Sequence, residues 1–234
     1  VDEIRQQVSP GRIGTGQWID LIQTAHEIGI PTTSTIMYGH IESSRHKAIH
    51  LGILRDIQKR TGGITEFVPL SFVYEEAPMF HRKSIPGLRR GASGAEVIKM
   101  YAISRLMLNN WIPNLQVSWV KEGPKLSQIA LLAGANDFGG TLINESISTA
   151  AGASHGQLMK PSQFRNLIRE MGRIPAERST TYQKIRVFES EDCPVDLLDE
   201  IDDSANRFGS YQNLIRLKDY RFKDFYRERK EQKQ

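Results

Sequence analysis

Cysteine is nearly absent from this sequence, whose 234 residues contain a single one, Cys193. One cysteine cannot form a disulfide within the chain, which favours a reducing compartment, and we predict a cytoplasmic protein. One cysteine also cannot supply the several thiolates that hold an iron–sulfur cluster. The chain by itself therefore lacks the ligands for such a cluster.

Long apolar runs are lacking as well, because none reaches the length of about 18 residues that a membrane span needs. The N-terminal residues 1–5 have no signal-peptide character. The excess of positive charge is small, +4 from 31 basic and 27 acidic side chains. Its clearest cluster lies at the extreme C-terminus, as expected for a solvated tail. We therefore expect neither a membrane partner nor a nucleic-acid partner.

Helical and strand-like segments alternate along most of the chain. The pattern predicts helices over 15–29, 43–63, 95–110, 126–132 and 161–171, and strands over 31–37, 67–73, 115–120 and 138–143. Such alternation indicates an α/β fold with a parallel sheet, and four strands with their helices make half of an eight-stranded TIM-type barrel. No strand precedes the first helix, and the chain does not begin with methionine. We therefore expect earlier strands to be missing or to lie on another chain.

The predicted organisation has two parts. Residues 1–188 are assigned to the C-terminal part of a barrel, with its last four strands and helices. Residues 189–234, acidic at first and then basic, are predicted to form a helical appendage with a frayed end. A long loop over 78–94 is rich in proline, glycine and basic residues. Loops of this length inside a compact domain are more often functional than idle.

The active sites of β/α barrels lie at the C-terminal ends of the strands, so the residues after each predicted strand are candidates. After the first strand, Tyr38 offers an aromatic face and a hydroxyl, and Gly39 allows close backbone approach to a ligand. Glu42 brings a carboxylate, although a charge at a helix start explains it equally well. Pro69 and Leu70, at the second strand, are also compatible with a plain core.

The third and fourth predicted strands are followed by further polar groups. Trp119 can stack on an aromatic ligand or pack in the core, and Lys121, Glu122 and Gly123 come directly after it. The densest polar patch of the sequence follows the next helix, and we favour a ligand site there over a simple turn. It comprises Asn136, Asp137, Gly139, Gly140, Thr141 and Glu145.

Histidines offer a weaker possibility. His46 and His50 are four residues apart on a predicted helix, with His40 and Glu42 just upstream. Such spacing can bind zinc, but the sequence contains no HExxH motif, and we assign no metal site. Neither GxGxxG, a phosphate loop nor a Ser–His–Asp arrangement is indicated. A metal-dependent barrel hydrolase stays open as a competing interpretation.

Three segments together resemble one group of radical S-adenosylmethionine enzymes. They are PTTSTIMYGHIE at 31–42, the stretch 61–72 with TGG and FVPLSF, and ANDFGGT at 135–141 with Glu145. The group contains the deazaflavin (FO) synthases and the menaquinone enzymes of the futalosine route. Within it, the stretch 144–156 most resembles the tyrosine-using subunit of FO synthase. The resemblance covers roughly residues 1–188.

The resemblance implies a transferase that joins the 4-hydroxybenzyl group of L-tyrosine to 5-amino-6-(D-ribitylamino)uracil, in coenzyme F420 biosynthesis. It implies S-adenosylmethionine and a [4Fe–4S] cluster as cofactors, and the other FO synthase subunit as a candidate protein partner. The family's cluster-binding CxxxCxxC motif is absent from this sequence. We therefore expect activity from the intact enzyme and not from this chain alone. The same residues are also compatible with a related enzyme of the menaquinone route or with a non-catalytic fragment.

The resemblance also assigns residues to ligands. It places S-adenosylmethionine beside the first two predicted strands, at Tyr38, Gly39, His40, Glu42, Pro69 and Leu70. It places tyrosine or the ribityl-pyrimidine near the last strand, at Asn136, Asp137, Gly139, Gly140, Thr141 and Glu145. Trp119 joins this second set as a candidate stacking surface. No catalytic residue is assigned.

Overall fold

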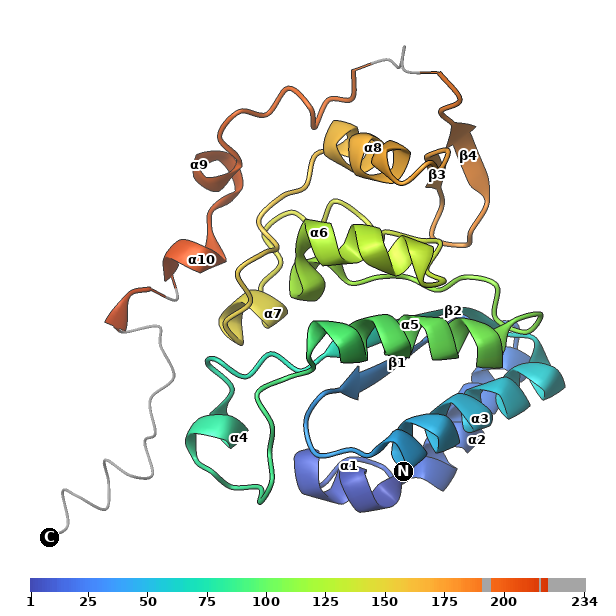
Figure 1. The fold of residues 1–234 in the computed structure, drawn as a ribbon. Coiled ribbons are helices and arrows are strands. Elements are labelled where there is room, and N and C mark those ends of the chain that lie inside the picture. Colours follow the sequence, from blue (N-terminus) through green and yellow to red (C-terminus); the bar gives the residue numbers. More distant parts are fainter. Residues whose placement is uncertain (191–194, 215, 219–234) are drawn as a thin grey trace, which may run out of the picture.

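The computed structural model describes residues 1–190, 195–214 and 216–218, and Cys193 lies outside them. Its central element is a pair of parallel strands, β1 (Thr32–Tyr38) and β2 (Ile64–Ser71), with helices packed beside them (Figure 1). A second, antiparallel pair is formed by β3 (Ala176–Arg178) and β4 (Lys184–Val187). The structure is therefore mixed α/β, as the alternation of segments predicts.

Helices make up most of the remaining regular structure. They are α1 (Asp2–Val8), α2 (Thr15–Glu27), α3 (Ser44–Thr61), α4 (Pro78–His81), α5 (Gly94–Leu108), α6 (Trp119–Leu132), α7 (Ile147–Ala150), α8 (Pro161–Glu170), α9 (Ser204–Phe208) and α10 (Tyr211–Leu214). None of the described helices is long and apolar enough to cross a membrane. The predicted helices over 15–29, 43–63, 95–110 and 161–171 are confirmed to within a few residues at each end.

Local sequence signals explain where the long helices begin and end. The Ser43 hydroxyl accepts a hydrogen bond from the His46 backbone N–H and caps α3, and Ser93 caps α5 in the same way through Glu96. These side chains satisfy backbone N–H groups that have no partner within the helix. Gly62 follows α3 with a φ of 68°, a left-handed conformation that ends helices and suits glycine.

The third and fourth predicted strands were wrong as extended strands. Beyond β2, parallel pairing continues only as isolated bridges, from Phe67 to Leu115 and from Gln116 to Asp137. Helix α6 begins at Trp119, inside the predicted strand over 115–120, and the Gly139-Gly140 pair weakens an extended conformation after Asp137. The described residues therefore contain no closed barrel, although the order of the paired segments follows the chain.

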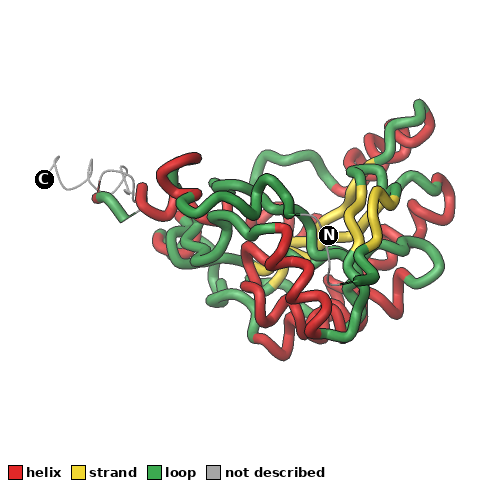
Figure 2. Tube along the Cα trace, turned by 90° about the horizontal axis from the view of Figure 1, so that it is seen from above, coloured by secondary structure: helices red, strands yellow, loops and turns green. Residues whose placement is uncertain are grey.

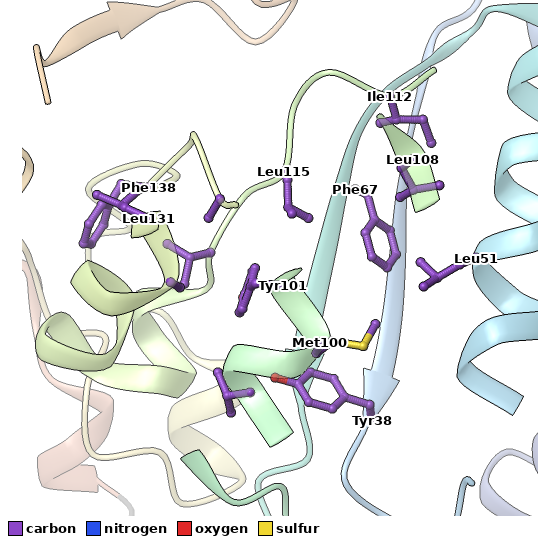
Figure 3. Packing of buried hydrophobic residues seen from close by; sticks show 14 of the residues in the cluster. Tyr38, Leu51, Phe67, Met100, Tyr101, Leu108, Ile112, Leu115, Leu131 and Phe138 are labelled. Carbon is purple, nitrogen blue, oxygen red and sulfur yellow. The ribbon is translucent and has the colours of Figure 1, made fainter. Parts of the chain in front are cut away.

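One face of the parallel sheet packs against helices α3 and α5. In register, Ser34 pairs with Phe67 and Tyr38 pairs with Ser71, and all four side chains are buried. Phe67 and Tyr38 belong to the main hydrophobic cluster, which Figure 3 shows together with Leu51 of α3 and Met100 of α5. Burial of these large side chains is the main stabilising contribution to this layer.

The other face of the sheet carries the alternate residues of each strand. Thr33 pairs with Glu66 and Met37 pairs with Leu70, and Met37 is 38% exposed. The β3–β4 hairpin reaches Glu66 from this side, because the Tyr182 hydroxyl between its strands donates to the Glu66 carboxylate. This hairpin lies within the part assigned to barrel units and was not predicted.

The described residues after 188 include two short helices, α9 and α10. Helices α9 and α10 lie at the opposite end of the molecule from the β3–β4 hairpin in both views (Figures 1 and 2). They reach the loop around α7 through Asn144, whose side-chain oxygen accepts from the Tyr211 backbone N–H and whose amide donates to the Phe208 carbonyl. The predicted division of the chain at residue 188 stays a prediction.

Candidate functional site: a polar cavity at the ends of the strands

A cavity of about 260 Å³ lies where β2 ends. Four segments enclose it: the end of β2 with the residues after it, the last part of the loop before α5, the start of α6 and the turn after α7. Its lining consists of Ser71, Phe72, Val73, Tyr74, Glu75, Arg90, Gly91, Ala92, Lys121, Glu122, Gly152, Ala153 and Ser154. In Figure 1, α4 and α7 lie beyond the tip of the β1 arrow, at this same edge. The cavity is thus at the C-terminal edge of the sheet, where barrel sites form.

The wall of the cavity carries charges of both signs. Lys121 and Glu122 are half-buried, whereas Glu75 and Arg90 are exposed at the rim. Gly152 closes the remaining side against Glu75, since a side chain at this glycine would meet the Glu75 Cβ at 2.5 Å. The Glu76 backbone N–H also donates to the Ala151 carbonyl at 2.9 Å. The loop after α7 is therefore held closely against the segment that follows β2.

Glu122 is held in a fixed position by buried hydroxyl groups. The Tyr38 hydroxyl donates to Glu122 Oε1 at 3.4 Å, and Ser71 hydrogen-bonds the same carboxylate. Tyr38 is fully buried, which fixes the direction of its hydroxyl. Burial raises the pKa of Glu122, and the hydrogen bonds from Ser71 and Tyr38 and the nearby Lys121 oppose that shift. A partly desolvated carboxylate therefore faces the cavity.

Lys121 presents the complementary charge. Within the described part of the chain its ammonium group makes no hydrogen bond and no ion pair within 4.0 Å. Burial lowers its pKa, and the attraction of Glu145 and Glu122 acts in the opposite direction. A cation that is half-buried without a direct partner costs free energy unless a ligand or water compensates it.

The predicted cofactor residues after β1 form a tight turn. The Glu42 carboxylate accepts from the backbone N–H groups of Gly39 at 2.8 Å and His40 at 2.9 Å. His40 Nε2 donates to the Met37 carbonyl, while its Nδ1 accepts from the Ile41 N–H at 2.8 Å. Burial lowers the pKa of His40, so the ring is neutral and its contact with Glu42 is not an ion pair. The N–H groups of this turn are therefore engaged within the protein.

Gly39 allows the turn after β1 to lie close to the backbone of residues 91–92. Its φ is 87°, and a Cβ atom there would lie 2.5 Å from the Ala92 backbone nitrogen. Arg89 adds a second link, because its Nε donates to the His40 carbonyl and its guanidinium contacts both Glu42 and Glu96. The turn after β1 thus fixes residues 89–92, of which Arg90, Gly91 and Ala92 line the cavity.

The two predicted cofactor residues of β2 differ in their surroundings. Pro69 is fully buried on the helix side, and its carbonyl accepts from the Tyr101 hydroxyl at 3.4 Å. Leu70 lies on the opposite face, half-buried and paired in register with Met37. Of the predicted cofactor residues, Leu70 has the surroundings best suited to contact a ligand lying on the face away from the helices.

Trp119 is part of the core. It is 3% exposed, its ring meets Phe164 edge-on with centroids 6.1 Å apart, and its Nε1 donates to the Gly140 carbonyl at 2.9 Å. Gly139 lies close to the Gln116 amide, at 3.3 Å from a hypothetical Cβ. Packing therefore accounts for the positions of these residues, and their predicted contact with substrate stays a prediction.

Asn136 and Asp137 lie toward the N-terminal end of the sheet. The Asn136 side-chain oxygen accepts from Arg105 and from the Leu115 backbone N–H, both at 2.8 Å. Asp137 pairs with Arg178, with Nε and Oδ2 2.5 Å apart. These contacts hold the short parallel bridges together. The predicted contacts of Asn136 and Asp137 with substrate stay predictions.

The last two predicted substrate residues lie nearer the cavity. Thr141 accepts a backbone hydrogen bond from Met159 through its carbonyl, and Glu145 caps α7 by accepting from the N–H groups of Ile147 and Ser148. Glu145 also lies close enough to Lys121 to affect its pKa. The structure therefore brings Glu145, but not Asn136, to the cavity side of the molecule.

None of the predicted site residues lines the cavity itself. Its charged groups had weaker signals in the sequence: Lys121 and Glu122 follow the third predicted strand, and Arg90 belongs to the basic loop over 78–94. Tyr38 acts on the cavity indirectly, through Glu122. The sequence signal for Lys121 and Glu122 was their position just after a predicted strand. The family motif at 31–42 contains the turn after β1, which supports the cavity wall.

The histidines of the possible metal site do not meet. His46 accepts from the Ser43 backbone N–H and lies 3.4 Å from Glu3, whereas the His50 ring packs near Phe67 in the core. Burial lowers the pKa of His50 to about 4. Across residues 1–190, 195–214 and 216–218, no three histidine, cysteine, aspartate or glutamate side chains form a group that could hold a metal ion. The geometry therefore gives no support to a metal-dependent hydrolase.

Comparisons with known proteins point to one enzyme group. Residues 61–191 match the model of the CofH/MqnC C-terminal region. The chain is 52% identical over 184 residues to 5-amino-6-(D-ribitylamino)uracil–L-tyrosine 4-hydroxyphenyl transferase 1 of Methanococcus maripaludis. The aligned region covers 79% of this chain and 50% of the relative. Two further transferases of the same name are similar to this chain. That of Methanothermobacter thermautotrophicus is 51% identical, over 79% of this chain and 49% of the relative. That of Methanocaldococcus jannaschii is 49% identical, over 78% of this chain and 50% of the relative. The chain spans about half the length of these relatives.

Proposed function

The chain belongs to the CofH/MqnC C-terminal region family, and we propose that it forms the C-terminal half of a radical S-adenosylmethionine transferase. The reaction would join the 4-hydroxybenzyl group of L-tyrosine to 5-amino-6-(D-ribitylamino)uracil. The observation that carries this proposal is the identity of about half of all aligned residues to the named transferases. The polar cavity at the C-terminal edge of the sheet supports it, because barrel enzymes bind substrate there.

The residues of this chain do not fit the iron–sulfur cluster that such a transferase needs. The sequence has one cysteine, whereas the family motif supplies three thiolates. No step through the cluster can therefore be assigned to these residues. In the proposed enzyme they supply the wall of the substrate cavity, while the cluster is held by residues outside this sequence.

S-adenosylmethionine has a better-suited contact surface in this chain. When bound, it supplies the radical that starts the reaction. Leu70 and Met37 form an accessible apolar pair on the sheet face away from the helices, suited to the flat face of an adenine. Glu42, His40 and Arg89 would act indirectly, by fixing the turn and the cavity wall next to it.

The proposal is tested by completing the enzyme. The chain is co-expressed with the half of the Methanococcus maripaludis transferase that it does not cover, the cluster is reconstituted, and formation of the coupled product from L-tyrosine and the uracil is followed by mass spectrometry. The chain alone and the other half alone, treated identically, are the controls. Product from the combination and none from either half supports the proposal. A soluble, cluster-loaded combination that makes no product contradicts it.

A further inference from the structure

The cavity contains two opposite charges that neutralise each other poorly. Lys121 and Glu122 are neighbours in sequence at the start of α6, and successive helical side chains point in different directions. No ion pair joins them within 4.0 Å, although both line the cavity. Each charge is thus available to a group inside the cavity, and a ligand with a single charge would satisfy one and be repelled by the other.

The cavity wall has four charged side chains, two carboxylates and two cations. One of each is half-buried, and one of each is exposed at the rim. Lys121 and Glu122 are half-buried, and Arg90 and Glu75 are exposed at the rim. Among the described residues, neither Arg90 nor Lys121 has a carboxylate within salt-bridge distance. A ligand carrying an anionic and a cationic group a few bonds apart matches this arrangement.

From this geometry we infer that the cavity binds the α-amino-acid end of its ligand. Lys121, assisted by Arg90, faces the carboxylate, and Glu122 faces the ammonium group. The inference rests on the proposed function and adds the ligand group and the residues that recognise it. Two molecules of the proposed reaction carry such a group, L-tyrosine and S-adenosylmethionine.

The size and support of the cavity agree with this assignment. A volume of about 260 Å³ is below the usual range for sites that enclose a whole drug-sized ligand, and suits a small polar group. The Tyr38 and Ser71 hydroxyls hold the Glu122 carboxylate, so its orientation is set before a ligand arrives. Charge-assisted hydrogen bonds in such a preorganised site are stronger than those between neutral groups. Tyr38 is therefore a positioning residue for ligand binding.

The test is a calorimetric titration of the purified chain with matched ligands. L-tyrosine carries both charges, tyramine lacks the carboxylate, and 3-(4-hydroxyphenyl)propionate lacks the ammonium group. We expect L-tyrosine to bind at least about tenfold more tightly than either analogue, the effect of losing one hydrogen bond to a charged group. L-methionine and S-adenosylmethionine are titrated in parallel to identify which of the two molecules the cavity prefers.

Two variants give the inference its specificity. Lys121→Met keeps most of the unbranched side chain without its charge and should weaken L-tyrosine and the propionate at least about tenfold, while leaving tyramine unchanged. Glu122→Gln keeps the shape and the contact with Tyr38, and should weaken L-tyrosine and tyramine but not the propionate. Lys125→Met is the matched control, because Lys125 is exposed in α6 just beyond the break at Gly123 and does not line the cavity.

Several outcomes would overturn the inference. They are equal binding of L-tyrosine and tyramine in a chain that also fails to bind S-adenosylmethionine, loss of all ligands alike in Lys121→Met, and failure of every amino acid to bind the folded chain. If S-adenosylmethionine, and not L-tyrosine, binds and is weakened by both Lys121→Met and Glu122→Gln, the cavity holds the methionine end and the inference stands. Each of these results is independent of the product assay, so the completed enzyme can be active while this assignment fails.

Discussion

The two ends of the parallel sheet use polar residues in contrasting ways. At the N-terminal end, Asp137 is paired with Arg178, and Glu66 accepts from the Tyr182 hydroxyl. At the C-terminal end, Lys121 faces a cavity with no ion-pair partner among the described residues, and Glu122 is held only by hydroxyl groups and one backbone contact. Buried polar groups that are paired within a protein stabilise its fold, whereas those left unpaired indicate a ligand. The contrast separates supporting residues from candidate binding residues.

The same contrast explains the position of the densest polar patch of the sequence, whose predicted contacts with substrate stay predictions. Asn136 and Asp137 lie beside the isolated parallel bridges, where no regular ladder of backbone hydrogen bonds forms. Their side-chain hydrogen bonds connect these segments in its place. Polar residues at this end are required by the fold itself. The cavity, by comparison, uses few polar residues, and these come from separate segments of the chain.

The largest expected effect on stability is at the N-terminal end. Arg178→Met leaves the Asp137 carboxylate buried without its partner, and we expect a loss of about 2 kcal/mol in the free energy of unfolding. Urea denaturation followed by circular dichroism measures it. Arg173→Met, at an exposed position just before β3, is the control and should change stability little. Equal stability of both variants would mean that the ion pair does not hold the hairpin.

A comparable loss is expected at one backbone position beside the cavity. Gly39→Ala forces a side chain against the Ala92 backbone nitrogen at a positive φ, and should cost about 2 kcal/mol. Gly62→Ala has a positive φ but nothing within 4 Å, so it should show only the conformational cost of about 1 kcal/mol. Thermal unfolding of the two variants compares them. If they are equally stable, the close approach of residues 91–92 to this turn is not required.

A pair of tyrosine variants compares the two ends directly. Tyr182→Phe removes the hydroxyl bound to Glu66, and Tyr38→Phe removes the one bound to Glu122. Each should cost about 1 kcal/mol of stability, the usual value of one hydrogen bond. Only Tyr38→Phe should also weaken L-tyrosine, severalfold, as measured by calorimetry. A similar change of affinity in both variants would remove the distinction between the two ends.

The smallest effect concerns acid sensitivity near the cavity. Backbone hydrogen bonding from Ser93 and the Arg89 guanidinium lower the pKa of Glu96 from 4.5 to about 2. Because the folded-state pKa is depressed, the stabilisation is fully present above pH 4.5 and is lost as the pH falls toward 2. Glu96→Gln should therefore be less stable than the native chain at neutral pH by less than about 1 kcal/mol, since exposed pairs are screened. The difference should vanish near pH 2, and urea titrations between pH 2 and 7 measure it.

Much of the fold was predictable because its signals are local. The Ser43 and Ser93 caps, the Gly62 stop and the apolar periodicity of α3 and α5 act over a few residues, so the sequence indicates these helices correctly. The parallel pairing of β1 with β2 also followed, from the alternation of strands and helices. The strands predicted after β2 failed because burial and side-chain hydrogen bonds, not an extended ladder, hold residues 115–118 and 136–140.

The sequence by itself determined the α/β class, the main helices, the family, and the lack of thiolates for a cluster. It could not determine which polar residues face a cavity, because that depends on which of them find partners from distant segments. Asp137 meets Arg178 and Tyr38 meets Glu122 only after the chain has folded. The tertiary structure alone left Lys121 unpaired in a cavity, and that difference in pairing distinguishes the candidate binding residues from those that hold the fold together.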